Sequence, residues 1–336
     1  MKQKFLKMLQ FVFFLTTGLV LLYYAFRGID LNELMSQIKH ADYRWVVFSL
    51  VFSALALVFR TFRWKLLIDP LDEHPKRINI FHAINIGYLA NFVFPRIGEI
   101  TRCGILNRTD HVPAGSLFGT VIVERIFDIL MVVLTLCLIL LCRFHMVANF
   151  IMEHVIQPLM SNFQGMIGLG RSLAIIALVM LIFLFCLRIF RKQLSKITFL
   201  QKLKNLVRGV LTGIQSARRM RSFWLFIFLS FIVFVMYFMQ TYVMFFALES
   251  TSSLGLVEAL FILAISSLAM IVPVQGGIGA YHWLISMGLT IFGLTREEGM
   301  VYATITHSVT SILFILLGAV SLFFVFYGNR FKKKNL

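Results

Sequence analysis

The stretch Pro273-Val274-Gln275-Gly276-Gly277-Ile278-Gly279-Ala280-Tyr281-His282 interrupts an apolar part of the chain. The apolar segments around it, 256–272 and 278–292, are both shorter than the roughly 20 residues that a helix needs to cross a bilayer. Proline removes a backbone donor, and three glycines in four positions leave the backbone conformationally permissive. Non-helical backbone at membrane depth is tolerated only where protein buries it or where it lines a wet cavity. We therefore predict a broken helix here and expect the functional centre beside it.

The composition indicates an all-α polytopic membrane protein. Hydrophobic residues make up 59% of the 336 residues and the mean hydropathy is +0.86, whereas soluble domains are about 45–50% apolar. The net charge is +17, but the basic residues gather in short segments between apolar runs, as in loops that face anionic lipid. A nucleic-acid-binding surface would need a basic stripe with interleaved exposed aromatics, and the sequence has none. We expect membrane lipids, and no nucleic acid, as partners.

Eight hydrophobic regions predict six full spans and two re-entrant broken helices within a single membrane domain, 1–336. The spans are expected at 5–26, 45–67, 115–142, 172–190, 223–248 and 300–327. The first broken helix is 80–94, which ends at Pro95, and the second is 256–292. The first two connections are expected to be a polar segment at 27–44 and a polar stretch that holds Arg102, Arg108 and Asp110. The later ones are a weakly charged loop at 143–171, with an interfacial segment around 150–160, and a basic amphipathic segment at 191–221.

The distribution of basic residues tests this topology. If both broken helices return to the side from which they start, both termini, the 60–77 region and the 191–221 segment all lie on the cytoplasmic side. The two broken helices then enter from opposite sides, and each has a glycine three residues after its proline. Interrupted segments in oppositely oriented halves are typical of a transporter site at the midplane. We therefore expect an inverted repeat of 45–142 and 223–327.

Three charged residues, Glu124, Arg125 and Asp128, lie about ten residues inside an apolar span. Glu124 and Asp128 are four apart and share a helix face, while Arg125 can pair with Asp128 at a spacing of three. Ionisable groups at this depth are costly and usually face an interior cavity or each other. They predict a substrate site, and the alternative is a structural ion-pair lock between helices.

The first break carries Arg96, Gly98 and Glu99. An arginine beside exposed backbone amides suits a phosphate, because a guanidinium group forms bidentate hydrogen bonds to its oxygens. Three further arginines, Arg60, Arg63 and Arg102, are candidate headgroup anchors. Arg60 and Arg63 share a helix face and can extend towards the headgroups. The alternative is that these arginines are ordinary interfacial anchors.

The second break supplies polar groups of another kind. We assign Pro273, Gln275, Gly276, Gly277, Gly279 and His282 to the candidate substrate site. Tyr281, Thr304 and His307 are able to donate or accept hydrogen bonds beside it, although a lone histidine in a membrane often only joins two helices. The four cysteines have no metal-type spacing, and no GxSxG, HExxH, P-loop or DxD-type signature occurs. We expect no metal, no cofactor and no enzymatic activity.

Four motifs occur in the order found in a known family. They are Arg60-x-x-Arg63-Trp64-x-Leu66-Leu67, Asn91-x-x-x-Pro95-Arg96-x-Gly98-Glu99-x-x-Arg102, Glu124-Arg125-x-x-Asp128 and Pro273-x-x-Gly276-Gly277-Ile278-Gly279. By these motifs, over nearly the whole chain, the sequence resembles the flippase-like, lysylphosphatidylglycerol-synthase transmembrane-region family. The resemblance implies an integral protein of the bacterial inner membrane that moves or handles lipids, such as aminoacylated phosphatidylglycerol or lipid-linked glycans.

Two departures from the family pattern bear on the substrate. The full synthases carry a C-terminal aminoacyl-transferase domain that this chain lacks, so by resemblance it is expected not to make lysylphosphatidylglycerol. Many relatives have glutamate where His282 stands. If that glutamate contacts a cationic headgroup, a different substrate is expected here, because imidazole is a poor substitute for a fixed negative charge.

Together these observations predict a flippase-like lipid transporter. The headgroup is expected to pass through a polar cavity lined by residues 95–99, 124–128 and 275–282, while the acyl tails stay in the bilayer. Without an ATP site, transport would be downhill, ion-coupled or driven by a partner. The rival hypothesis is a non-transporting membrane partner that anchors or regulates a lipid- or glycan-modifying enzyme.

Overall fold

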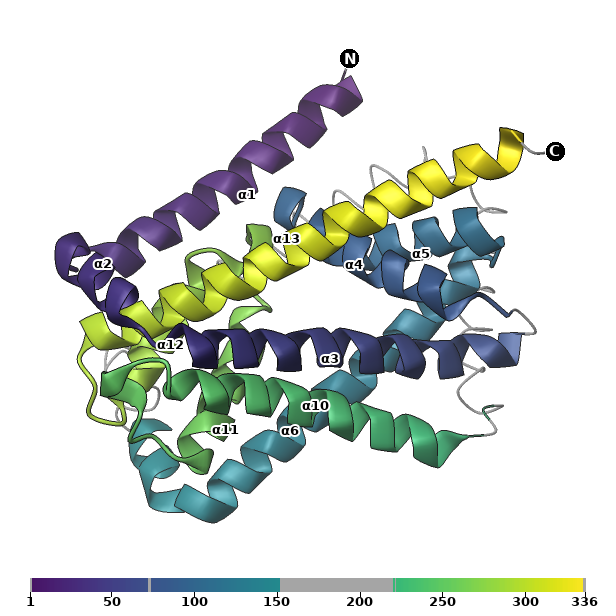
Figure 1. The fold of residues 1–336 in the computed structure, drawn as a ribbon. Coiled ribbons are helices and arrows are strands. Elements are labelled where there is room, and N and C mark those ends of the chain that lie inside the picture. The colour runs from purple at the N-terminus through teal and green to yellow at the C-terminus, as the bar shows by residue number, and fades with distance from the viewer. Residues whose placement is uncertain (1, 72–73, 152–219, 221, 335–336) are drawn as a thin grey trace, which may run out of the picture. The chain divides into compact units, whose positions relative to one another are not determined.

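The computed structural model describes residues 2–71, 74–151, 220 and 222–334, and every regular element among them is helical. The α-helices are α1 (Lys2–Phe26), α2 (Leu31–His40), α3 (Tyr43–Ile68), α4 (Arg77–Val93), α5 (Gly98–Asp110), α6 (Ala114–Ile151), α10 (Phe223–Phe245), α11 (Leu256–Ala269), α12 (Ala280–Thr290) and α13 (Arg296–Lys334) (Figure 1). Short 3-10 helices are η1 (Asp69–Leu71), η3 (Glu249–Thr251) and η4 (Gln275–Gly277). The predicted all-α class is confirmed.

Four described helices are long and apolar enough to cross a membrane. They occupy Tyr43–Leu71, Ala114–Cys142, Phe223–Phe245 and Arg296–Phe326. Helix α1 covers the predicted first span. The predicted span 172–190, nearly all of the basic segment 191–221 and most of the interfacial segment 150–160 lie outside the described residues. The chain divides into two compact units, Met1–Cys137 with Gly209–Leu336, and Leu138–Arg208, and the contacts described below belong to the first.

The first break is the tip of a helical hairpin, hairpin 1, formed by α4 and α5. The backbone reverses at residues 94–97, where Arg96 adopts a positive φ of 59°. At the base, the Asn79 side-chain amide donates to both carboxylate oxygens of Asp110 at 3.0 Å. At the tip, the Gly98 amide donates to Asn91 Oδ1 at 2.7 Å. The polar stretch expected after the break is therefore helix α5, which pairs with α4 throughout.

The second break is the tip of another hairpin, hairpin 2, formed by α11, η4 and α12. Its reversal uses three left-handed glycines, Gly276, Gly277 and Gly279, with φ between 58° and 82°. At the base, the rings of Phe261 and Phe292 meet edge to face at 5.3 Å between centroids. The broken helix predicted from the Pro-Gly stretch is confirmed.

Helix α13 shows how the two hairpins are oriented, because it contacts both along one face. Gly299 packs against the backbone of Ser286 near the base of hairpin 2, and His307 Nε2 lies 2.8 Å from the Gly276 carbonyl at its tip. Further along, Ser321 Oγ lies 3.0 Å from His82 Nδ1 near the base of hairpin 1. At 1.5 Å per residue, positions 299 and 321 are about 33 Å apart. The hairpins therefore point towards each other from opposite ends, as predicted.

The tips of the two hairpins touch midway. The Phe92 ring occupies the space that a side chain at Gly276 would need, 2.5 Å from an ideal Cβ. The Arg96 guanidinium group donates to the carbonyl of Ile271. Helix α1 covers the tip of hairpin 2, where a Cβ on Gly279 would lie 2.6 Å from the Leu22 nitrogen. Three segments far apart in the sequence thus meet at the second break.

Helices α3 and α10 pack side by side and antiparallel. The rings of Trp45 and Phe246 lie 5.1 Å apart, and the Asp42 amide donates to the Ala247 carbonyl at 2.8 Å. The chain contains two sets of elements in which a long helix is followed by a hairpin and a second long helix. These sets are α3 to α6 and α10 to α13. The polar connection expected at 27–44 contains an unpredicted helix, α2, which is capped by Asp30 and packs on α13.

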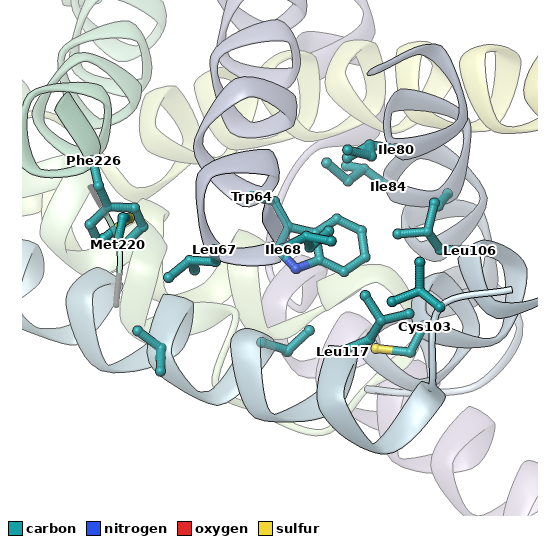
Figure 2. Close-up of a cluster of buried hydrophobic side chains, with 14 of the residues drawn as sticks. Trp64, Leu67, Ile68, Ile80, Ile84, Cys103, Leu106, Leu117, Met220 and Phe226 are labelled. Carbon is teal, nitrogen blue, oxygen red and sulfur yellow. The ribbon is translucent and has the colours of Figure 1, made fainter. Parts of the chain in front are cut away.

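A hydrophobic core holds hairpin 1 against its neighbours (Figure 2). The core includes Trp64 and Leu67 of α3, Ile84 of α4, Leu106 of α5 and Leu117 of α6. The Trp64 indole nitrogen donates to Thr120 Oγ1 at 2.9 Å, which satisfies its one polar atom in the apolar interior. This core fixes the helices that carry the charged residues described below.

The opposed hairpins predict a labelling pattern. Lys76 precedes α4 at the base of hairpin 1, and Ser253 precedes α11 at the base of hairpin 2; both are exposed. In a variant without native cysteines, Lys76→Cys and Ser253→Cys should react with a membrane-impermeant maleimide from opposite sides of sealed vesicles. Labelling of both from the same side would contradict the arrangement.

Candidate functional site

Glu124 is the centre of a buried charged network. It lies on α6, its side chain is 0% exposed, and both carboxylate oxygens face arginines. Oε1 lies 2.8 Å from Arg60 and 2.7 Å from Arg63, both on α3, and Oε2 lies 2.8 Å from Arg102 on α5. One carboxylate therefore joins three helices.

Asp128 extends the network by one helical turn. Its Oδ1 accepts a hydrogen bond from Arg63 Nη1 at 2.7 Å, so Arg63 bridges the two carboxylates of α6. Arg60 also donates to two tyrosine hydroxyls, Tyr88 of α4 and Tyr237 of α10, the latter at 3.2 Å. The network thus reaches the hairpin, both long helices beside it and α10.

Helical spacing places these groups. Arg60 and Arg63 are three residues apart on α3, and Glu124 and Asp128 are four apart on α6, so each pair lies on one face. The guanidinium of Arg102 stacks over the Trp64 ring at 4.5 Å, which holds it against the hydrophobic core. Arg60 and Arg63 do not extend towards the headgroups as predicted, because both side chains are buried in ion pairs with Glu124.

Arg125 and Glu99 form the outer edge of the network. Arg125 lies 3.5 Å from Glu99, 3.8 Å from Glu124 and 3.4 Å from Asp128. The pairing of Arg125 with Asp128 at a spacing of three is as expected, although the contact is long. The Arg125 side chain is 42% exposed, whereas those of Arg60, Arg63, Arg102 and Glu124 are 9% exposed or less. Arg125 is therefore the arginine of the network that faces outward.

A second polar group surrounds the tip of hairpin 2. Gln275 and His282 are buried, and the His282 ring lies edge to face with His307 at 4.9 Å between centroids. His307 Nε2 lies 2.8 Å from the Gly276 carbonyl, so this histidine lies beside the second break, as expected, and also joins α13 to it. His282 Nδ1 is buried without a hydrogen-bond partner.

The predicted site residues fall into these two groups. Arg60, Arg63, Glu99, Arg102, Glu124, Arg125 and Asp128 form one network. The tip of hairpin 2 contains Gln275, Gly276, Gly277, Gly279 and His282, and Pro273 is exposed there. Gly98 lies at the tip of hairpin 1, where it packs against Gly87 of the facing helix. Arg96 connects the hairpins through Ile271 rather than joining the network.

Two tyrosines, Tyr88 and Tyr237, belong to the network and were missed. Each lies in an apolar helix where a tyrosine looks like any other packing aromatic, and only the position of its hydroxyl reveals the role. A cavity of about 370 Å³ among the described residues is lined by Gln37, His40, Leu248, Glu249, Ser250 and Glu298, none of which lies in the predicted cavity lining 95–99, 124–128 and 275–282. Among the described residues no group of three or more histidines, cysteines or carboxylates is placed to hold a metal ion.

Comparison with known proteins gives this arrangement a family. The model of the lysylphosphatidylglycerol synthase TM region matches residues 8–318, which include both hairpins and the whole charged network. The chain belongs to this family. The resemblance read from the four motifs is thereby confirmed.

Two relatives of this lysylphosphatidylglycerol synthase TM-region protein share shorter stretches. A UPF0104 membrane protein of Methanocaldococcus jannaschii is 28% identical over 103 residues, which are 30% of this chain and 31% of the relative. The glycosyltransferase AglD of Haloferax volcanii is 30% identical over 103 residues, 30% of this chain and 16% of the relative. The chain thus spans less than a third of the length of either. No solved structure matches significantly.

Proposed function

We propose that this protein is a flippase-like lipid transporter that carries a phospholipid or lipid-linked headgroup across the inner membrane. The observation that supports this most is the meeting of two oppositely directed hairpins inside the helical bundle. Broken helices in opposed halves are the usual sequence and structural sign of a transport site at the midplane. The two matching sets of elements, α3 to α6 and α10 to α13, are the halves of the proposed inverted repeat.

The tips supply polar backbone where a lipid bilayer offers none. The Ile271 and Gly276 carbonyls lie outside the α-helices, and the side chains of Arg96 and His307, respectively, contact them. Such backbone in a membrane protein needs burial or a wet cavity. In the proposed mechanism the tips are the closed barrier, and their separation opens a path for the headgroup.

The buried network gives the path its charge. Glu124 and its arginines join hairpin 1 to α3 and α6, so movement of the hairpin requires that the ion pairs with Arg102 and Glu99 rearrange. Intramembrane charges are costly and are most often functional. The structural-lock alternative and the transport role are thus compatible, because the lock is on the element proposed to move.

Charge supports an orientation. Helix α1 passes Gly279 at Gly18 and ends where Arg296 binds the Tyr24 carbonyl, so its N-terminus points towards the base of hairpin 1. The basic residues 330–334 are the last residues of α13, beyond Ser321, which contacts the same base. We propose that this end is cytoplasmic and that both termini lie there.

Reconstitution tests transport. The purified protein in liposomes should accelerate the movement of a fluorescent phospholipid between leaflets, measured by dithionite quenching of the outer leaflet. Empty liposomes and liposomes with an unrelated helical membrane protein give the baseline. Failure to move phosphatidylglycerol, phosphatidylethanolamine and a polyprenyl-linked glycan above that baseline would defeat the proposal.

A second candidate function is a membrane partner of a lipid- or glycan-modifying enzyme. It is favoured by the match to part of a protein named as a glycosyltransferase, in which the matched region is 16% of the chain. Under this hypothesis the protein moves no lipid in liposomes, and its removal from cells changes the product of an enzyme that co-purifies with it.

A further inference from the structure

Two histidines meet beside the second break, outside the charged network. His282 lies in the first turn of α12 and His307 lies on α13, and their rings lie edge to face with 4.9 Å between centroids. Both residues are buried, with 5% and 7% of their surface exposed. Histidine is the side chain whose charge ordinarily changes between pH 5 and pH 8. The pair is therefore a candidate site for the binding of protons.

The pair lies where the two tips and α1 meet. His307 Nε2 lies 2.8 Å from the carbonyl of Gly276, and the Phe92 ring of hairpin 1 occupies the space beside that same glycine. The ring of Phe26, on α1, lies 5.8 Å from the His282 ring. These neighbours help to keep water from the histidines. Separation of the tips would remove part of this packing and so change the hydration of the pair.

A proton on either ring has no partner of opposite charge while the tips touch. His282 Nδ1 is buried and makes no hydrogen bond, and within the described part of the chain neither histidine forms an ion pair with a carboxylate. The first turn of α12 also places the positive end of a helix dipole at His282, which opposes a cation there. A buried charge without a partner is costly. The closed tips therefore favour two neutral rings.

The charged and titratable groups on the neighbouring elements do not offset this cost. Arg96 of hairpin 1 and Arg296 of α13 are cations, and both donate to backbone carbonyls. Glu258 of α11 and Glu298 of α13 accept hydrogen bonds from backbone amides at the starts of their own helices, at the base of hairpin 2 rather than its tip. The Tyr281 ring lies 5.2 Å from that of the second histidine, but a phenol is neutral at these pH values, as are the titratable side chains described on α1.

We propose that His282 and His307 form a proton-binding site that couples separation of the hairpin tips to proton uptake. The inference rests on the proposed function, in which the tips are the barrier, and adds the ion to which their opening is coupled. A histidine in water takes up a proton near pH 6.5. The proton comes from bulk water when the tips separate and returns to it when they close. Because protons bind the separated state and not the closed one, acidity favours separation and a pH above 6.5 favours closure.

The distance between the tips in the full-length protein tests the proposal. In a variant without native cysteines, spin labels are attached at Val93→Cys and Ile271→Cys, which are exposed positions on the two tips. Dipolar broadening in the EPR spectrum, recorded in nanodiscs between pH 5 and pH 8, then measures how many molecules have separated tips. If one histidine takes up a proton only when the tips are apart, the ratio of separated to closed tips should rise about 30-fold from pH 8 to pH 5, mostly below pH 6.5.

Removal of both protonatable rings should remove the response. His282→Gln combined with His307→Gln keeps polar side chains that cannot be charged, so tip separation should no longer depend on pH in this range. The matched control is His74→Gln, because the His74 side chain is 78% exposed and lies outside both hairpins, and it should keep the full pH dependence. A purely structural role would lower the unfolding midpoint of the double variant equally at pH 5 and pH 8, whereas a proton-binding role changes the pH profile.

Each outcome has a meaning. If the labelled protein with both histidines has the same tip distance at pH 5 and pH 8, the inference is overturned, whether or not the double variant folds. A pH response that survives in the double variant overturns it as well, and loss of the response in that variant but not in His74→Gln supports it. Tip separation that depends on pH without lipid movement in liposomes defeats the transport proposal but not the inference, and lipid movement with tips that ignore pH does the reverse.

Discussion

Glu124→Gln is expected to lower the free energy of unfolding by about 3–5 kcal/mol, because it leaves buried arginines without their shared carboxylate. Glu124 contacts Arg60, Arg63 and Arg102 at 2.7–2.8 Å, and its side chain is 0% exposed. Glutamine keeps the shape and can accept hydrogen bonds, but it cannot balance the charge. The measurement is the unfolding midpoint of the purified protein in a titration with denaturing detergent, together with its abundance in the membrane.

The matched control for this substitution is Asp69→Asn. Asp69 pairs with Lys65 four residues earlier, and both side chains are partly exposed. Such pairs contribute about 0.3–0.5 kcal/mol, so the control should unfold almost with the unsubstituted protein. A Glu124→Gln protein that unfolds at the midpoint of the control would show that the arginines do not depend on this carboxylate.

Gly98→Ala is expected to destabilise hairpin 1 by about 1–3 kcal/mol through overpacking. A Cβ at Gly98 would collide with the Gly87 carbonyl and lie 2.7 Å from the Asn91 side chain. The Gly87 carbonyl is a backbone atom of the facing helix, so it cannot move away without a shift of α4 from α5. The measurement is again the unfolding midpoint, with hydrogen exchange at α4 and α5 to show that the loss is local.

Gly104 on the same helix provides the comparison. An ideal Cβ at Gly104 meets no atom within 4 Å, and alanine is the better helix former by about 1 kcal/mol. Gly104→Ala should therefore leave the protein unchanged or slightly more stable. If the two variants behaved alike, close approach at Gly98 would not be what closes the hairpin.

The broken helices were predictable from sequence because the signal is local. Pro95, Pro273 and the glycines after each end an apolar run that is too short to span, and the charge pattern then fixes the direction of each hairpin. Helix α5 was not predicted. Its buried face includes Arg102, Cys103 and Leu106, and a buried arginine makes the sequence of a helix look like that of a polar loop.

The candidate site was predictable as a set of residues but not as an arrangement. The spacing predicted that Glu124 and Asp128 share a helix face. The sequence of α6 does not predict that Arg60, Arg63 and Arg102 approach Glu124 from two other helices. Those distances depend on how helices pack around Trp64. The same holds for His307, whose contact with the Gly276 carbonyl depends on the position of α13.

The contacts of α13 impose a constraint on chain length. Gly299, His307 and Ser321 each meet a different part of the two hairpins, and at 100° per residue they fall on one face of the helix. Inserting a single residue between two of them would turn one contact away from its hairpin by that angle. We therefore expect the length of α13 between Gly299 and Ser321 to be fixed, while side chains on the face away from the hairpins can vary.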